Sequence, residues 1–196
     1  MDILSEIESN ARSRKIPVIL PDTRAFLEEL CLSLKPKRIL EIGMAVGYSA
    51  SVMLRATDAS ITCLEASVPN IKEARQNFEK QGLSNRVNIV EGDCVVTLPK
   101  LNEKFDLIFL DGPKGKYVEL IPLILPLLSE NGVWVSDNVL FRGMVLDGKA
   151  ISEPRFNHTV EVLRCFIDNL EKNEKLDTRV YHIGDGLCVV KYKGKK

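Results

Sequence analysis

The stretch Arg38-Ile39-Leu40-Glu41-Ile42-Gly43-Met44-Ala45-Val46-Gly47-Tyr48-Ser49 decides the fold. Its apolar residues predict a short buried strand over 38–42, its glycines a tight turn, and the residues from Tyr48 onward the start of a helix. In a parallel α/β sheet such a turn lies at the carboxyl end of a strand, where ligands bind. Gly43 and Gly47 suit this place because a residue without a Cβ lets a ligand approach the backbone.

The details of this stretch exclude two common nucleotide-binding motifs. The glycine spacing is not G-x-G-x-x-G, and no Gly-Lys-Ser/Thr follows as in a phosphate loop. Glu41 is unusual because a carboxylate inside a strand is costly to bury without a partner. We therefore expect Glu41 to face a hydrogen-bond donor or a cationic ligand; a helix cap or an ion pair is the alternative.

The rest of the chain predicts alternating strands and helices. Strands are expected over 38–42, 59–64, 87–90, 105–110 and 133–136, and a hairpin over 179–183 and 187–192. Helices are expected over 2–13, 22–34, 47–57, 68–81 and 155–171. A further helix is expected after Lys114 and runs to about Leu128. This pattern predicts an α/β fold with a mostly parallel seven-stranded sheet, a C-terminal antiparallel hairpin and helices on both faces.

Length and composition predict one domain. The chain has 196 residues, which leaves no room for a second sizeable core. We expect a single domain over 1–196, with residues 1–35 as an N-terminal helical cap segment. Lys and Arg together number 27, as do Asp and Glu, so the global charge points neither to nucleic acid nor to a membrane. The most apolar stretch, 121–128, is too short to span a bilayer.

The five cysteines are scattered and include no C-x-x-C pair. This spacing argues against a zinc site or a disulfide framework and favours buried, reduced thiols of a cytoplasmic protein. Basic residues are locally enriched over 11–38 and in the tail, where they occur at Lys191, Lys193, Lys195 and Lys196. A solvated surface and an RNA contact are both open interpretations of these basic segments.

Acidic residues follow the second and third predicted strands. An acid in the position of Glu65 accepts hydrogen bonds from ribose hydroxyls in nucleotide-binding α/β folds. Asp93 follows the next strand and is positioned to approach an adenine amino group. Either acid is alternatively a helix cap.

Asp111, Asp137 and Asn138 follow two further strands and supply only oxygen ligands. Such a set suits Mg²⁺, and it suits zinc poorly because no histidine or cysteine accompanies it. Turn-forming Asp and Asn residues are the alternative. Lys114 is a candidate general base, or a surface lysine. His158 and His182 lie in regular elements without a Gly-x-Ser-x-Gly elbow, which argues against a hydrolytic triad.

These motifs together resemble the cation-dependent S-adenosylmethionine O-methyltransferases, which include catechol and caffeoyl-CoA methyltransferases. The similar segments are Glu41–Ala50, Phe105–Lys114, Asp137–Leu140 and Gly184–Leu187, within a match that covers roughly 16–192. Within that family, the segment Asn138-Val139-Leu140-Phe141-Arg142-Gly143 is similar to the bacterial tRNA 5-hydroxyuridine methyltransferases. The resemblance implies a Rossmann-like methyltransferase domain.

The resemblance also implies roles for individual residues. Glu65 would hold the cofactor ribose, Asp93 and Cys94 would border the adenine, and Asp111 would contact both cofactor and metal. The methionine part would be surrounded by Ile19, Glu41, Gly43 and Ser49. Mg²⁺, or another divalent cation, would lie on Asp111, Asp137 and Asn138 and lower the pKa of the acceptor hydroxyl. Lys114 would help to remove its proton.

The implied acceptor is the 5-hydroxyl of the wobble uridine in a tRNA anticodon loop, and a small catechol-like or phenolic acceptor is the alternative. We expect anticodon phosphates to be held by basic residues at the pocket mouth: Arg12, Arg14, Lys15, Arg142 and Lys149. We also expect a cytoplasmic homodimer without membrane contact. A nicotinamide dehydrogenase and a non-catalytic RNA-binding module stay open, although neither needs Asp137 and Asn138.

Overall fold

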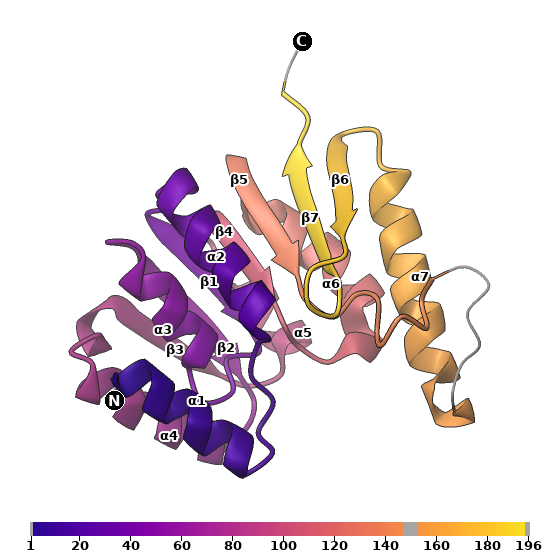
Figure 1. The fold of residues 1–196 in the computed structure, drawn as a ribbon. Helices are drawn as coiled ribbons and strands as arrows, with labels where there is room; N and C mark the ends of the chain where they lie inside the picture. Colours follow the sequence, from indigo (N-terminus) through magenta and orange to yellow (C-terminus); the bar gives the residue numbers. More distant parts are fainter. Residues whose placement is uncertain (1, 147–152, 195–196) are drawn as a thin grey trace.

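Seven strands form one sheet in the order β3-β2-β1-β4-β5-β7-β6. Figure 1 shows this computed structural model, which describes residues 2–146 and 153–194. The strands are β1 (Arg38–Ile42), β2 (Ser60–Glu65), β3 (Val87–Glu91), β4 (Phe105–Leu110), β5 (Leu128–Ser136), β6 (Leu176–Tyr181) and β7 (Leu187–Tyr192). The first five are parallel, and β7 runs antiparallel to both β5 and β6. The predicted fold class is confirmed.

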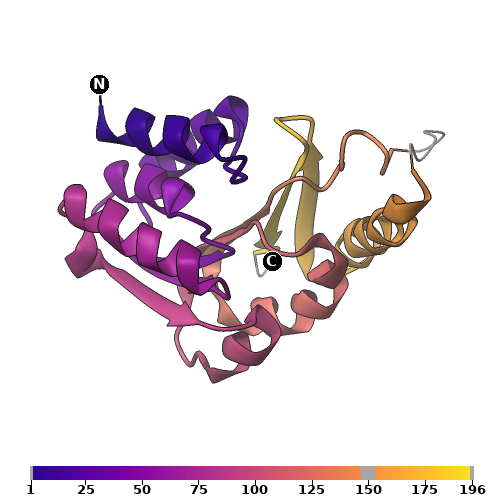
Figure 2. The same cartoon turned by 90° about the horizontal axis from the view of Figure 1, so that it is seen from below.

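Helices cover both faces of this sheet. They are α1 (Ile3–Ser13), α2 (Pro21–Leu34), α3 (Tyr48–Arg55), α4 (Val68–Lys80), α5 (Cys94–Thr97), α6 (Tyr117–Ile124) and α7 (Asn157–Glu171). Short 3₁₀ turns are η1 (Ser84–Arg86), η2 (Leu98–Lys100), η3 (Lys114–Lys116), η4 (Leu125–Leu127) and η5 (Pro154–Phe156). One core packs α1 to α4 on one face, and a second core packs α5 to α7 on the other. Figure 2 shows the indigo and purple N-terminal helices gathered on one side of the strands.

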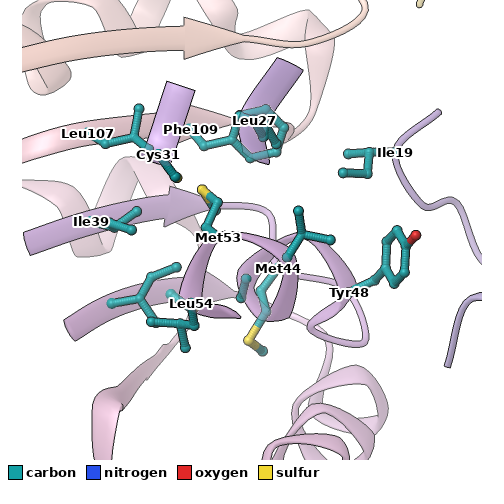
Figure 3. Packing of buried hydrophobic residues seen from close by; sticks show 14 of the residues in the cluster. Ile19, Leu27, Cys31, Ile39, Met44, Tyr48, Met53, Leu54, Leu107 and Phe109 are labelled. Atoms are coloured by element: carbon teal, nitrogen blue, oxygen red, sulfur yellow. The ribbon is translucent and has the colours of Figure 1, made fainter. Parts of the chain in front are cut away.

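The first core holds the glycine-turn region in place. Figure 3 shows Leu27 and Cys31 of α2 and Met53 of α3 near Leu107 and Phe109 of β4. These five side chains have essentially no exposed surface. Dense apolar packing of this kind fixes the strand ends that carry polar side chains, because a packed interior resists deformation.

The strand β5 begins earlier than the sequence predicts. We expected a helix up to about 128 and a strand from Val133, but β5 starts at Leu128. Its pairing with β4 shifts between Phe105, which pairs with Leu128, and Leu107, which pairs with Val133. Residues 130–132, which precede the predicted strand, therefore belong to an irregularity inside β5. Pro126 also ends the helical stretch early, because proline lacks an N–H and clashes with the preceding turn.

Two further predictions need correction. The first hairpin strand spans Leu176–Tyr181 rather than 179–183. Cys165 is exposed on α7, whereas the other four cysteines are buried as expected. All five, which lie in the described part of the chain, are free thiols. No helix within residues 2–146 and 153–194 is long and apolar enough to cross a membrane.

Candidate active site

A cavity of about 720 Å³ lies at the carboxyl ends of the parallel strands. It is lined by Pro17, Val18, Ile19, Leu20, Ile42, Gly43, Ala45, Leu64, Glu65, Ala66, Asn70, Gly92, Asp93, Cys94, Asp111, Gly112, Pro113, Lys114, Asp137, Asn138, Arg142, Gly184 and Asp185. Most of the predicted site residues are therefore brought together around one space. Glu41 and Ser49 are not part of this lining.

The glycine turn is tied to the neighbouring strand ends. Gly43 N donates to Leu64 O at 3.0 Å, and Asp111 N donates to Ile42 O at 2.9 Å. Gly43 has φ +93°, and a Cβ there would lie 2.4 Å from Asp111 O. The need for glycine thus comes from the close approach of the Asp111 backbone as well as from the left-handed conformation.

Glu65 joins two turns on the cavity wall. Its Oε2 accepts a hydrogen bond from Ala45 N at 2.8 Å, and its Oε1 accepts one from Ser67 N at 2.8 Å. The side chain is half-buried and lines the cavity. Glu65 therefore fixes the glycine turn against the start of α4, and its predicted contact with a ribose stays a prediction.

Asp93 is the N-cap of α5, which was the alternative interpretation of this acid. Its Oδ1 accepts from Val95 N at 2.9 Å, and its Oδ2 pairs with Lys116 Nζ at 2.5 Å. The hydrogen bond from Lys116 is the largest cause that lowers the pKa of Asp93. Asp93 and the buried Cys94 nevertheless both line the cavity, and their contact with an adenine stays a prediction.

Glu41 lies beneath the cavity with no exposed surface. It faces two donors: Ser49 Oγ is 2.5 Å from its Oε1, and Cys63 Sγ is 3.4 Å from its Oε2. Burial raises the pKa of Glu41 to about 8, and the charges of Asp111 and Glu65 act in the same direction. Glu41 is therefore a buried acid that connects β1 to α3 and β2.

This buried acid predicts a pH dependence of stability. Because the pKa of Glu41 is raised from 4.5 to about 8 on folding, the folded state holds a proton that the unfolded state releases between these values. Stability is then lost as pH rises through this window, by up to about 1.4 kcal/mol per unit. We expect Glu41→Gln to flatten this slope, so that its melting temperature relative to the wild type rises from pH 5.5 to 8. Parallel profiles of the two proteins would contradict the assignment.

The acids after β4 and β5 both line the cavity. Asp111 is half-buried, and its Oδ1 accepts from Lys114 Nζ at 2.6 Å. Asp137 is 1% exposed, and its Oδ1 accepts from Asn138 N at 2.7 Å. Its Oδ2 is buried and has no hydrogen-bond partner among the described residues. Burial raises the pKa of Asp137 to about 7, and the charge of Asp111 adds to the effect.

The donor set differs from an all-acid metal cluster. Within the described ranges, no three His, Cys, Asp or Glu side chains lie close enough together to hold a metal ion. The predicted set instead combines two carboxylates with the amide of Asn138, which adopts a left-handed conformation with φ 58°. Oxygen-only ligands with room for water are the kind of site that Mg²⁺ occupies.

Two residues that the sequence analysis did not select also shape this region. The Tyr117 hydroxyl lies 3.2 Å from Leu110 O and 3.1 Å from Asp137 O, so it bridges the ends of β4 and β5. Asp185, in the loop between β6 and β7, lines the cavity and accepts a hydrogen bond from Arg142 N at 2.6 Å. A tyrosine in an apolar helix and an acid between two glycines of a hairpin loop carry no local signal for these roles.

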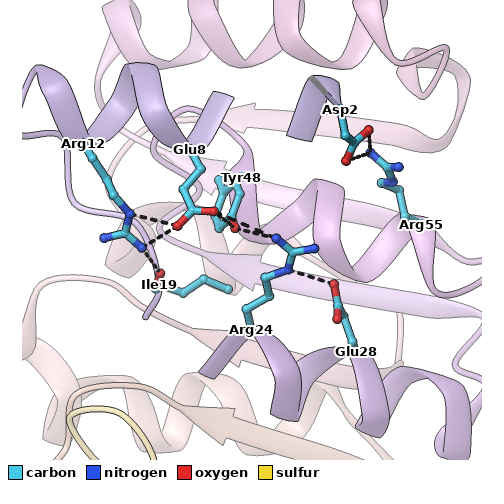
Figure 4. Close-up of polar contacts among 8 residues, drawn as sticks. All are labelled: Asp2, Glu8, Arg12, Ile19, Arg24, Glu28, Tyr48 and Arg55. Atoms are coloured by element: carbon cyan, nitrogen blue, oxygen red, sulfur yellow. Dashed lines mark hydrogen bonds and ion pairs between the residues drawn. The ribbon is translucent and has the colours of Figure 1, made fainter. Parts of the chain in front are cut away.

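The N-terminal segment forms another wall. Figure 4 shows how it is held: Tyr48 donates to Glu8 at 2.6 Å and accepts from Arg24 at 3.2 Å. Arg12 donates to Ile19 O at 3.1 Å, which fixes the backbone of a cavity-lining residue. These contacts tie α1 and α2 to the helix that follows the glycine turn.

The basic residues predicted at the pocket mouth are dispersed. Arg142 lines the cavity, whereas Arg12, Arg14 and Lys15 do not. Arg14 forms an ion pair with Glu73 of α4. Lys149, Lys195 and Lys196 lie outside the described residues.

The fold and the site together define a Rossmann-like methyltransferase. The defining features are the strand order, the glycine turn after β1, the acid that ends β2 and the polar side chains after β4 and β5. A family model described as O-methyltransferase matches residues 2–193, and the chain belongs to this family. The O-methyltransferase family predicted from the sequence is thus confirmed, and the likeness to its tRNA-specific members stays a prediction.

Individual relatives agree with this assignment. A catechol O-methyltransferase from Niastella koreensis is 30% identical over 186 residues, which cover 88% of this chain and 82% of that protein. Caffeoyl-CoA O-methyltransferase 2 from Eucalyptus globulus is 28% identical over 86% of this chain and 72% of its own length. The solved structure of the SAH-bound methyltransferase PaMTH1 from Podospora anserina is 31% identical, with a TM-score of 0.87 over 99% of this chain and 89% of that one.

Proposed function

We propose that this protein transfers a methyl group from S-adenosylmethionine to a hydroxyl group that is chelated by Mg²⁺ or another divalent cation. The observation that carries the metal part is the unpartnered Oδ2 of Asp137, because an isolated buried carboxylate oxygen is costly unless a cation or donor satisfies it. Asp111, Asp137 and Asn138 would hold the cation through oxygen atoms. When bound, the cation supplies a Lewis acid that lowers the pKa of the acceptor hydroxyl.

The side chains of the cavity support the remaining parts of the reaction. The adenosine end would lie between Glu65, Asp93 and Cys94, and the methionine end near Gly43 and Ile19. Lys114 lines the cavity, and its Nζ lies 2.6 Å from Asp111 Oδ1; in its neutral amine form it would take up the proton of the acceptor hydroxyl. The leaving thioether is neutral and needs no acid, so the protein's main contribution is to align donor and acceptor.

Glu65 provides a direct test of the cofactor site. A charge-assisted hydrogen bond is worth roughly 1.5–3 kcal/mol. We therefore expect Glu65→Ala to weaken the binding of S-adenosylmethionine about tenfold or more. Calorimetry should detect this change, with Glu91→Ala, an exposed acid at the end of β3, as the control. An unchanged dissociation constant would mean that Glu65 does not bind the cofactor and serves only its two backbone contacts.

For the acceptor, we propose the 5-hydroxyl of a wobble uridine in tRNA, and a small catechol-like or phenolic compound is the second candidate. The hydroxyl and the adjacent ring carbonyl of 5-hydroxyuridine chelate a cation much as a catechol does. Arg142 supports tRNA as the acceptor, because a cation at the cavity would contact an anticodon phosphate. Its guanidinium lies 5.6 Å from the centre of the Phe156 ring. The catechol and caffeoyl-CoA relatives support the second candidate. A cytoplasmic homodimer stays a prediction.

Charge reversal at Arg142 separates the two acceptors. Each phosphate contact makes binding depend steeply on salt, whereas a small catechol binds almost independently of salt. We expect Arg142→Glu to impair methylation of hydroxyuridine-containing tRNA and to spare activity on a catechol. Arg179→Glu, on the exposed part of β6, is the matched control. If the wild-type enzyme methylates catechols but leaves this tRNA untouched at low salt, the small-molecule candidate stands.

A further inference from the structure

The loop between β6 and β7 supports the segment that follows β5. Val139 N donates to Gly186 O at 3.0 Å, and Leu140 N donates to Asp185 O at 3.0 Å. The side chain of Asp185 adds a third contact, because its Oδ1 accepts from Arg142 N at 2.6 Å. Leu140 packs so closely on Gly186 that a Cβ there would lie 2.3 Å from Leu140 Cγ. These contacts connect two parts of the cavity wall that are far apart in sequence.

The supported segment has an unfavourable backbone conformation. Asn138, Phe141 and Arg142 have φ values of 58°, 44° and 58°, which side chains with a Cβ seldom adopt. Such residues persist only where the surrounding structure compensates for their strain. The backbone and side-chain contacts from Asp185 and Gly186 at Val139, Leu140 and Arg142 contribute to this compensation, as does the packing of Arg142 over Phe156.

The two ends of this segment carry different parts of the proposed site. Asn138 supplies the amide that would join Asp111 and Asp137 at the cation. Arg142 lines the acceptor end, and its side chain lies over Phe156 of η5. A change in the backbone at Arg142 would therefore alter both the acceptor contact and, through the three intervening residues, the amide of Asn138.

We infer that Asp185 is a positioning residue, whose carboxylate holds the 138–142 segment in the conformation that presents Asn138 to the cation and Arg142 to the acceptor. The catalytic consequence rests on the proposed function. The structural consequence does not, since it concerns the hydrogen bond to Arg142 N. A carboxamide oxygen can accept the same bond, whereas alanine cannot.

The test compares Asp185→Ala, Asp185→Asn and the control Asp177→Ala with the wild type. Asp177 is an acid on β6 that pairs with Arg179 and does not line the cavity. Amide hydrogen exchange over 138–146 reports the segment directly, and calorimetric titration with Mn²⁺ in the presence of S-adenosylhomocysteine reports the metal site. Loss of one hydrogen bond to a backbone N–H predicts about fivefold faster exchange and about fivefold weaker Mn²⁺ binding for Asp185→Ala.

Asp185→Asn and Asp177→Ala should stay within about threefold of the wild type in both measurements. With an accepted substrate, Asp185→Ala should lower kcat while the KM for S-adenosylmethionine stays unchanged. Exchange in Asp185→Ala that equals the wild type would overturn the inference. Equal effects of Asp185→Asn and Asp185→Ala on exchange and Mn²⁺ binding would also overturn it. The charge of Asp185, rather than its hydrogen bond to Arg142 N, would then be the decisive property. If the wild type itself binds no Mn²⁺, the proposed metal chemistry fails, and the exchange rates still decide the role of Asp185.

Discussion

Replacing Asp137 by asparagine is expected to abolish metal-dependent methyl transfer while leaving the fold and the cofactor site intact. The isosteric amide still accepts the hydrogen bond from Asn138 N, but the charge that a cation requires is gone. A cation contributes several kcal/mol of charge stabilisation in the transition state, so turnover should fall about 10³-fold or more. Asp111→Ala should also abolish turnover, because it removes the other carboxylate.

Stability measurements sharpen this prediction. Burial raises the pKa of Asp137 to about 7, so the ionised carboxylate destabilises the folded state of the metal-free protein. The metal-free Asp137→Asn variant should therefore be at least as stable as the wild type at pH 8, and it should bind S-adenosylhomocysteine equally well. Asp58→Asn, an exposed acid before the amino end of β2, is the control. Full turnover by Asp137→Asn would refute the metal assignment.

Gly43→Ala is expected to cause the largest loss of stability among the glycine-turn substitutions. The backbone has φ +93°, which costs an alanine about 1–3 kcal/mol. The new Cβ would also lie 2.4 Å from Asp111 O and 2.8 Å from Asp111 C, and these backbone atoms cannot rotate away. Overpacking of this kind costs about 1–3 kcal/mol, occasionally more. Asp111 would have to shift, so metal binding and cofactor binding should be lost together with stability.

Gly82→Ala separates the two causes. Gly82 also has a left-handed φ of +68°, but no described atom lies within 4 Å of a Cβ built there. This control carries the conformational cost without the collision. Urea unfolding should therefore show a clearly larger loss of unfolding free energy for Gly43→Ala than for Gly82→Ala. Equal losses would mean that the Asp111 backbone yields and that the close approach is unimportant.

Local sequence predicted the parallel strands well, because a strand buried on both faces is a nearly continuous apolar run. The early start of β5 was missed because it depends on pairing between Leu128 and Phe105, a contact that no local pattern contains. The Glu41 hydrogen bond to Ser49 lies within one strand–turn–helix unit, and the sequence did suggest a donor. The contact with Cys63 requires the register of β1 against β2.

The site was predictable where a side chain directly follows a strand. Glu65, Asp111 and Asp137 each end or follow a parallel strand, and such ends meet at one rim of the sheet. Asp185 and Tyr117 act through backbone groups of other segments, so their contribution depends on tertiary geometry. Arg14 was predicted at the pocket mouth from its charge alone, but its ion pair with Glu73 involves α4 rather than the cavity.

We expect methyl transfer by this protein to require a divalent cation. The most direct measurement follows transfer of labelled methyl groups from S-adenosylmethionine to hydroxyuridine-containing tRNA and to a catechol, in EDTA and after addition of excess Mg²⁺. We predict that EDTA abolishes transfer to whichever acceptor is used and that Mg²⁺ restores it in the wild type but not in Asp137→Asn. Undiminished transfer in EDTA would contradict the claim.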